Sequence, residues 1–182
     1  STAFVILVQF NLLTIILGLC SMLLAFSYPF MKRITYWPQL FLGLTFNWGI
    51  IMAWTAMNND ISLEIIFLYI AAIFWTLGYD TIYGAQDMAD DEIIGLKSTS
   101  LKFKKDIKLF VGISYLITLV LIVYLFLGEM GKNLFSLLLL LFAISLILQL
   151  INFDKNNPQK CLSSFKLNNY SGLLLFLTIL KI

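Results

Sequence analysis

The sequence has 182 residues, of which 60% are hydrophobic and only 12% are charged, and its mean hydropathy is +0.92. Soluble domains carry about 25% charged residues, so this composition excludes an ordinary soluble protein and indicates an integral membrane protein. The net charge of +2 gives no basis for nucleic-acid binding, and the absence of histidine excludes His-ligated zinc and His-dependent catalytic triads.

Uncharged apolar stretches predict the membrane spans, because a helix needs about 20 apolar residues to cross the hydrocarbon layer. The chain starts inside an apolar run, and we interpret residues 1–10 as the end of a truncated span, with further residues expected upstream of Ser1. Six full spans are predicted after it, at residues 12–29, 38–57, 61–79, 108–127, 133–153 and 168–181. The predicted fold class is an all-α polytopic membrane protein, with residues 1–182 forming a single membrane domain.

The basic residues test this layout, because loops rich in Lys and Arg remain in the cytoplasm. Of the twelve basic residues, only Lys132 and Lys181 fall on one side of the predicted membrane. All the others fall in or beside the alternate loops at 30–37, 80–107 and 154–167. We therefore predict that these three loops are cytoplasmic.

An acidic cluster follows the span at 61–79. Five of the ten acidic residues lie within residues 80–92. On one continuous helix, with 100° of rotation per residue, Asp80, Asp87 and Asp91 would lie within about 40° of one another. Asp87 and Asp91 would form an i, i+4 pair, whose like charges destabilise a helix unless a cation lies between them.

Acidic residues in a loop are most often simply solvated, so this pair alone is weak evidence for a metal site. Two further features favour one. The cluster begins on a span, where charge is costly, and Lys97 follows closely. Mg²⁺ takes a few carboxylates and shares its other positions with substrate phosphates. The pattern therefore predicts a Mg²⁺-diphosphate site at the membrane surface.

Four segments together resemble the UbiA superfamily of intramembrane prenyltransferases, in its 4-hydroxybenzoate polyprenyltransferase branch. The first is GYDTIYGAQDMADD at 78–91 with GLKST at 95–99, which resembles the second aspartate-rich motif of the family. The others are YPFMKR at 28–33, PQLFLG at 38–43 and NNYSG at 168–172. The similarity covers essentially the whole chain, and the combination of motifs is highly specific.

The resemblance implies a nine-helix bundle around a central cavity, in which the six full spans would be helices four to nine. It implies that Asp87 and Asp91 are the catalytic carboxylates and hold Mg²⁺ with the prenyl diphosphate. Asp90 would be a further metal ligand, and Asp80 would support substrate binding.

Three more residues are assigned to substrate binding. Arg33 matches a family arginine that holds the carboxylate of the aromatic acid, and Lys97 would contact phosphate; for both, the alternative is that they belong to the positive-inside signal. Tyr83 lies within the motif itself. The implied reaction transfers a polyprenyl group from polyprenyl diphosphate to 4-hydroxybenzoate, in ubiquinone biosynthesis. The implied location is the bacterial inner membrane, in contact with lipid.

One family feature has no match here. The first acidic motif, N-D-x-x-D-x-x-x-D, lies between helices two and three of the family and is not found in residues 1–182. A separate amino-terminal half is therefore an expected partner, and an inactive membrane fragment from a split or decaying gene stays open as the alternative function. A small transporter is disfavoured because the last three spans have no acidic residue in their interiors.

Overall fold

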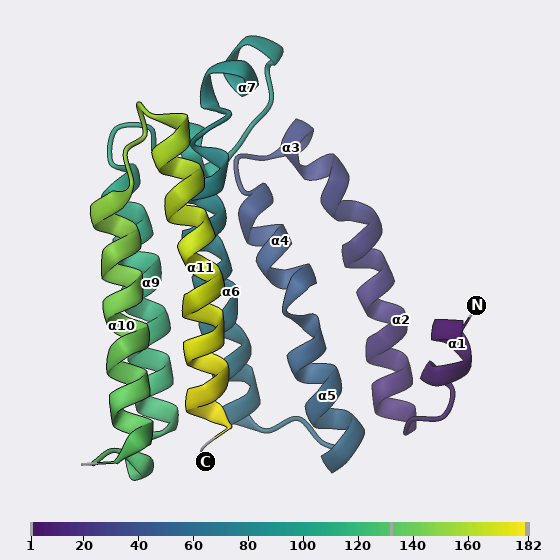
Figure 1. Cartoon of the computed structure of the whole chain (residues 1–182). Coiled ribbons are helices and arrows are strands. Elements are labelled where there is room, and N and C mark those ends of the chain that lie inside the picture. The colour runs from purple at the N-terminus through teal and green to yellow at the C-terminus, as the bar shows by residue number, and fades with distance from the viewer. Residues whose placement is uncertain (1, 132, 181–182) are drawn as a thin grey trace.

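The structure is a computed structural model that describes residues 2–131 and 133–180. Figure 1 shows long helices lying side by side, with shorter helices at their ends. The helices are α1 (Thr2–Leu7), α2 (Leu12–Ser27), α3 (Met31–Ile34), α4 (Pro38–Phe46), α5 (Trp48–Asn58), α6 (Leu63–Gly84), α7 (Met88–Ile94), α8 (Thr99–Lys102), α9 (Ile107–Leu125), α10 (Leu134–Asn152) and α11 (Pro158–Ile179). Short 3₁₀ turns lie at Tyr28–Phe30 and Leu127–Glu129. The all-α polytopic fold class is confirmed.

In the part of the chain that the structure describes, five helical segments are long and apolar enough to cross a membrane, namely Leu12–Ile34, Pro38–Asn58, Leu63–Gly84, Ile107–Leu125 and Leu134–Asn152. They coincide with the first five full spans predicted from the sequence. The sixth predicted span corresponds to α11, which begins ten residues earlier than expected, at 158 instead of 168. Asn157 caps α11 by accepting hydrogen bonds from two backbone N–H groups, and Pro158 suits the first helical position.

The span predicted at 38–57 is two helices rather than one. Asn47 separates α4 from α5 and has a non-helical backbone, with φ −89° and ψ 0°. Its side-chain amide donates to the carbonyls of Gly43 and Ala72 and to the hydroxyl of Thr76. The amide therefore fastens the break to α6, where a polar group within a span would otherwise lack a partner.

The centre of the bundle is α6, which packs against both α9 and α4, while α10 packs along α11. A buried chain of polar side chains crosses this packing. The Tyr115 hydroxyl donates to Gln149 Oε1 at 2.6 Å, and Gln149 Nε2 donates to Ser171 Oγ at 2.8 Å. These bonds join α9, α10 and α11 through one connected set of side chains. The hydrophobic core around them includes Ile82, Val111, Phe142 and Leu146.

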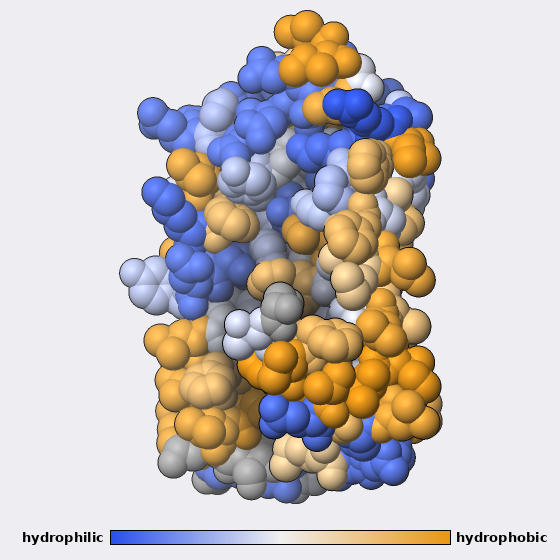
Figure 2. Space-filling view, turned by 90° about the vertical axis from the view of Figure 1, so that its right-hand side faces the viewer, coloured by the Kyte–Doolittle hydropathy of each residue, from blue (hydrophilic) through white to orange (hydrophobic). Residues whose placement is uncertain are grey.

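The connections α3–α4, α6–α9 and α10–α11 all lie at one end of the bundle, the end that carries α7. The α5–α6 and α9–α10 connections lie at the other end. Figure 2 shows hydrophilic side chains crowding the α7 end and hydrophobic side chains dominating the lower part of this face. The arrangement agrees with the alternation of loops predicted from the basic residues.

The direction of insertion is a prediction that cysteine labelling can check. Ala89, at the α7 end, and Met130, at the opposite end, are both exposed. In a background with Cys20→Ala and Cys161→Ser, we expect Ala89→Cys to react with a membrane-impermeant maleimide only from the cytoplasmic face. Met130→Cys should react only from the other face. Reaction of both positions from one face would contradict the span count.

Candidate functional site

The acidic cluster spans a break between two helices. Helix α6 ends at Gly84, and α7 begins at Met88 with Asp87 as its N-cap residue. The backbone N–H of Asp91 donates to the Asp87 carbonyl at 2.8 Å, so these two residues keep their i, i+4 relation across the first turn of α7. The expectation that Asp80 shares one helical face with them was wrong, because Asp80 lies on α6.

The end of α6 packs closely against two other segments of the chain. A Cβ atom on Gly84 would lie 3.0 Å from Ser100 Oγ and 3.1 Å from Gln39 Nε2. The chain therefore comes close to two other segments at this glycine, and a larger residue here would push them away. Beyond Gly84 the chain leaves the direction of α6, and α7 stands above the end of that helix, as Figure 1 shows.

Asp91 is the most enclosed acidic residue of the cluster. It is only 5% exposed, and its Oδ2 atom is buried without a hydrogen-bond partner. The nearest cation is the ammonium of Lys32, with Nζ 3.8 Å from Oδ2. A buried carboxylate is costly unless it is paired or coordinates a cation. The single long ion pair to a half-exposed lysine leaves coordinating capacity at Asp91.

The other acidic residues differ in their surroundings. Asp87 is partly buried at the start of α7, and Asp90 is exposed on the same helix. Asp80 is partly buried near the end of α6. The acidic residues of the cluster thus come from two helices, and Lys32 pairs with the one that is most buried.

Carboxylate oxygens such as those of Asp87 and Asp91 are of the chemical type that Mg²⁺ takes as ligands. Within residues 2–131 and 133–180, no three Asp, Glu, Cys or His side chains gather closely enough to hold a metal by themselves. Mg²⁺ usually takes one or two carboxylates and completes its shell with water and phosphate. Asp87 and Asp91, with the unsatisfied Oδ2 of Asp91, match that smaller donor set.

Helix α3 and the segment after α7 form the other side of the site. Gly95 ends α7 in the left-handed conformation, with φ +80°, which glycine adopts without strain. The chain then turns back so that Lys97 N–H donates to the Lys32 carbonyl at 2.8 Å, and Lys97 Nζ donates to the Ile34 carbonyl at 3.1 Å. An ammonium has three donors, so two remain on Lys97. Arg33 is exposed on α3.

A wall of aromatic rings lies between α6 and α11. The Trp75 ring centroid lies 6.0 Å from that of Tyr79, and the Tyr79 centroid lies 6.0 Å from that of Phe165. Tyr83 continues the wall, with its ring centroid 4.7 Å from that of Phe165. Tyr83 is thus on the α11 side, and within residues 2–131 and 133–180 no hydrogen bond or ion pair joins it to the acidic cluster.

A buried polar frame that the sequence analysis missed holds the site in place. The Gln39 side chain accepts a hydrogen bond from Thr99 N–H at 2.9 Å. The hydroxyls of Thr81 and Thr99 lie 2.7 Å apart, and Ser100 Oγ donates to the Thr81 carbonyl at 2.8 Å. Thr99 therefore has a structural role, because these bonds fasten the start of α8 to α6 and α4. The available signal was the polar Gln39, directly after the Trp37-Pro38 pair that opens a span.

Comparison with known proteins agrees with this architecture. The model of the UbiA prenyltransferase family matches residues 1–173. A solved apo structure of a UbiA homologue from Aeropyrum pernix K1 superposes with a TM-score of 0.76 at 22% identity, covering 96% of this chain and 66% of that one. At this identity the likeness establishes the fold.

Curated relatives are similar over nearly the whole chain. A mitochondrial 4-hydroxybenzoate polyprenyltransferase from Bos taurus is 40% identical over 176 residues, which are 96% of this chain and 47% of that protein. A 4-hydroxybenzoate octaprenyltransferase from Vibrio vulnificus is 39% identical over 177 residues, 97% of this chain and 62% of that protein. The chain thus spans about half to three-fifths of the length of these relatives. It belongs to the UbiA prenyltransferase family.

Proposed function

We propose that a protein containing this chain transfers a polyprenyl group from polyprenyl diphosphate to 4-hydroxybenzoate. The observation that carries the proposal is the buried, unsatisfied carboxylate oxygen of Asp91, which lies beside Lys32 at the end of the bundle. The proposal is further supported by relatives that are named for this activity and are about 40% identical over nearly the whole chain.

The acidic residues would hold Mg²⁺ and the diphosphate. Asp87 and Asp91 are the ligands we propose, with Asp90 as a further ligand and Asp80 in support. Bound there, Mg²⁺ would stabilise the negative charge that the diphosphate gains as it leaves. Asp90 is the weakest member of this set because its side chain is exposed.

The basic residues around the site have separate tasks. Lys97 would offer its two remaining ammonium donors to phosphate oxygens, and its backbone N–H bond to the Lys32 carbonyl joins the two segments that carry these lysines. Arg33 would bind the carboxylate of 4-hydroxybenzoate, since a planar guanidinium can bind a carboxylate through two parallel hydrogen bonds. Its exposed position on α3 leaves its donors accessible.

The reaction breaks the bond between the allylic carbon and the diphosphate oxygen and forms a bond between that carbon and the aromatic ring. Diphosphate departs as the first bond breaks, and after the new bond has formed the ring loses a proton to water and regains aromaticity. The allylic carbon becomes cationic on the way, and water must be kept from it. The wall formed by Trp75, Tyr79, Tyr83 and Phe165 is suited to that task and to an extended prenyl chain.

The experiment is a transfer assay in membranes that contain the active protein, with polyprenyl diphosphate and radiolabelled 4-hydroxybenzoate. We expect product with Mg²⁺ and none after chelation with EDTA, with recovery when Mg²⁺ is added back. Product formation that persists in EDTA would show that the reaction does not require Mg²⁺. A folded protein that makes no product under any of these conditions would favour the alternative of a non-catalytic membrane fragment.

The cellular location is also part of the proposal. The relatives include both a bacterial enzyme and mitochondrial ones. We infer a bacterial inner membrane. Within it, the α7 end would face the cytoplasm, because the basic residues gather at that end.

A further inference from the structure

A basic cleft lies away from the acidic cluster, between the start of α9 and the connection from α10 to α11. Its volume is about 370 Å³. It is lined by Lys105, Asp106, Ile107, Lys108, Leu109, Phe153, Asp154, Lys155 and Asn156. The two lining segments are separated by more than forty residues in the sequence and meet only in the folded bundle.

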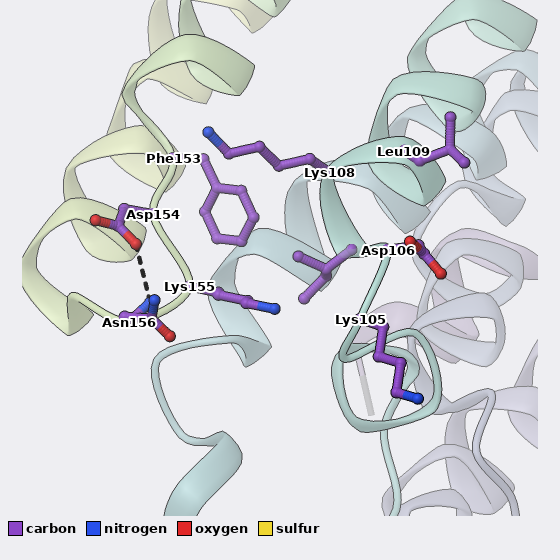
Figure 3. A pocket seen from close by; sticks show the side chains of 9 residues that line it. Lys105, Asp106, Lys108, Leu109, Phe153, Asp154, Lys155 and Asn156 are labelled. Atoms are coloured by element: carbon purple, nitrogen blue, oxygen red, sulfur yellow. Dashed lines mark hydrogen bonds between the residues drawn. The ribbon is translucent and has the colours of Figure 1, made fainter.

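Two lysines, Lys108 and Lys155, reach into the cleft from opposite sides. Figure 3 shows Lys108 extending from α9 toward Phe153, and Lys155 extending in the opposite direction from the α10–α11 connection. Lys155 Nζ donates to the Lys104 carbonyl at 2.8 Å, which holds its ammonium across the opening and leaves two donors free. The side chain of Phe153 is buried and forms the floor between them.

The charge balance of the cleft favours an anion. Asp154 accepts a hydrogen bond from Asn156 N–H at 3.1 Å and lies 3.8 Å from Lys160 Nζ, so its charge is compensated outside the cleft. Asp106 is the N-cap residue of α9, but its side chain makes no capping hydrogen bond. Its negative charge therefore opposes the binding of an anion. The first turn of α9 adds the positive end of a helix dipole. The three lysines that line the cleft therefore outnumber Asp106, the one lining acid whose charge is not compensated.

An apolar stripe begins at the cleft and continues down α9. Leu109 lines the cleft and is 64% exposed, and Ile113, Leu116 and Val120 are also exposed on successive turns. Residues at i, i+4, i+7 and i+11 lie on one helix face. This face belongs to one of the membrane-spanning helices, so hydrocarbon is its natural surrounding. A ligand that fits both features has an anionic head and apolar tails.

We propose that this cleft binds the phosphodiester headgroup of an anionic phospholipid, with the acyl chains along the Leu109 stripe of α9. Basic pockets between spanning helices on the cytoplasmic side recognise such headgroups. The inference concerns a surface separate from the acidic cluster and does not depend on the proposed prenyl transfer.

Native mass spectrometry of the purified protein in detergent tests the proposal. Phosphatidylglycerol should be retained in preference to phosphatidylcholine of the same chain length. One lysine near an anionic headgroup contributes about a fivefold change in binding. Lys108→Gln and Lys155→Gln should therefore each weaken retention about fivefold, and the double variant by more than about tenfold. Asp106→Asn should strengthen it.

Lys166→Gln is the matched control, because Lys166 is exposed on α11 and does not line the cleft. It removes the same charge and should leave retention unchanged. Equal loss in Lys166→Gln and Lys108→Gln would overturn the proposal, since general charge would then explain the binding. So would equal retention of the two lipids. Displacement of phosphatidylglycerol by equimolar inorganic phosphate would show a free-phosphate site instead of a lipid site. Thermal unfolding of each variant verifies that it is folded.

Discussion

Asp91→Asn is expected to lower prenyl transfer by about 10²–10³-fold, which is the usual loss when a positioned charge partner is removed from a reacting centre. The buried carboxylate oxygen of Asp91 has no hydrogen-bond partner, and Lys32 is its one ion-pair partner within residues 2–131 and 133–180. An amide would keep the shape of the side chain but lose the charge that a cation requires. Asp87→Asn is expected to have an effect of the same order.

The measurement is Mg²⁺-dependent product formation in membranes with equal amounts of each variant. Glu92→Gln is the matched control, because Glu92 lies next to Asp91 on α7 but is exposed and pairs with Lys104 at 2.6 Å. We expect it to retain at least about half of the rate, since exposed ion pairs contribute little. Retention of more than about a tenth of the rate by Asp91→Asn would contradict the metal-binding role.

Gly78→Ala is expected to destabilise the bundle by about 1–3 kcal/mol, the usual cost of overpacking a close contact. A Cβ atom at Gly78 would collide with Cε1 of Tyr115, because it would come nearer than real side chains approach. The Tyr115 ring cannot turn away cheaply, because it is buried and its hydroxyl is bonded to Gln149. The strain therefore falls on the contact between α6 and α9.

The measurement is thermal unfolding in detergent. Gly49→Ala is the control, because a Cβ atom there meets nothing within 4 Å, and alanine is the better helix former by about 1 kcal/mol. We expect Gly49→Ala to leave the melting temperature unchanged or raise it, while Gly78→Ala lowers it. Adding Tyr115→Leu to Gly78→Ala should recover part of the loss if the contact is the cause. Equal melting temperatures for the two alanine variants would refute the close-packing argument.

The membrane class, the alternation of loops and the positions of the first five full spans were predictable from the sequence. The physical reason is that each depends on local composition: a run of about 20 apolar residues crosses the membrane in any fold, and lysines mark the loops between them. The motif at 78–91 was equally readable, because its residues are contiguous. The early start of α11 was missed, since its first half is too polar to read as a span and its start depends on the Asn157 cap.

Only the tertiary structure decided which residues of the candidate site are near one another. Asp91 is buried and faces Lys32, although fifty-nine residues separate them, and Gln39 bonds to the backbone of Thr99 across sixty. The helix break after Gly84 places Asp80 and Asp91 on different helices, and at Gly84 the chain packs closely against Ser100 and Gln39, which come from other segments. Periodicity describes positions within one helix. It contains no information on where that helix ends against its neighbours, and so pairings between distant segments come from packing alone.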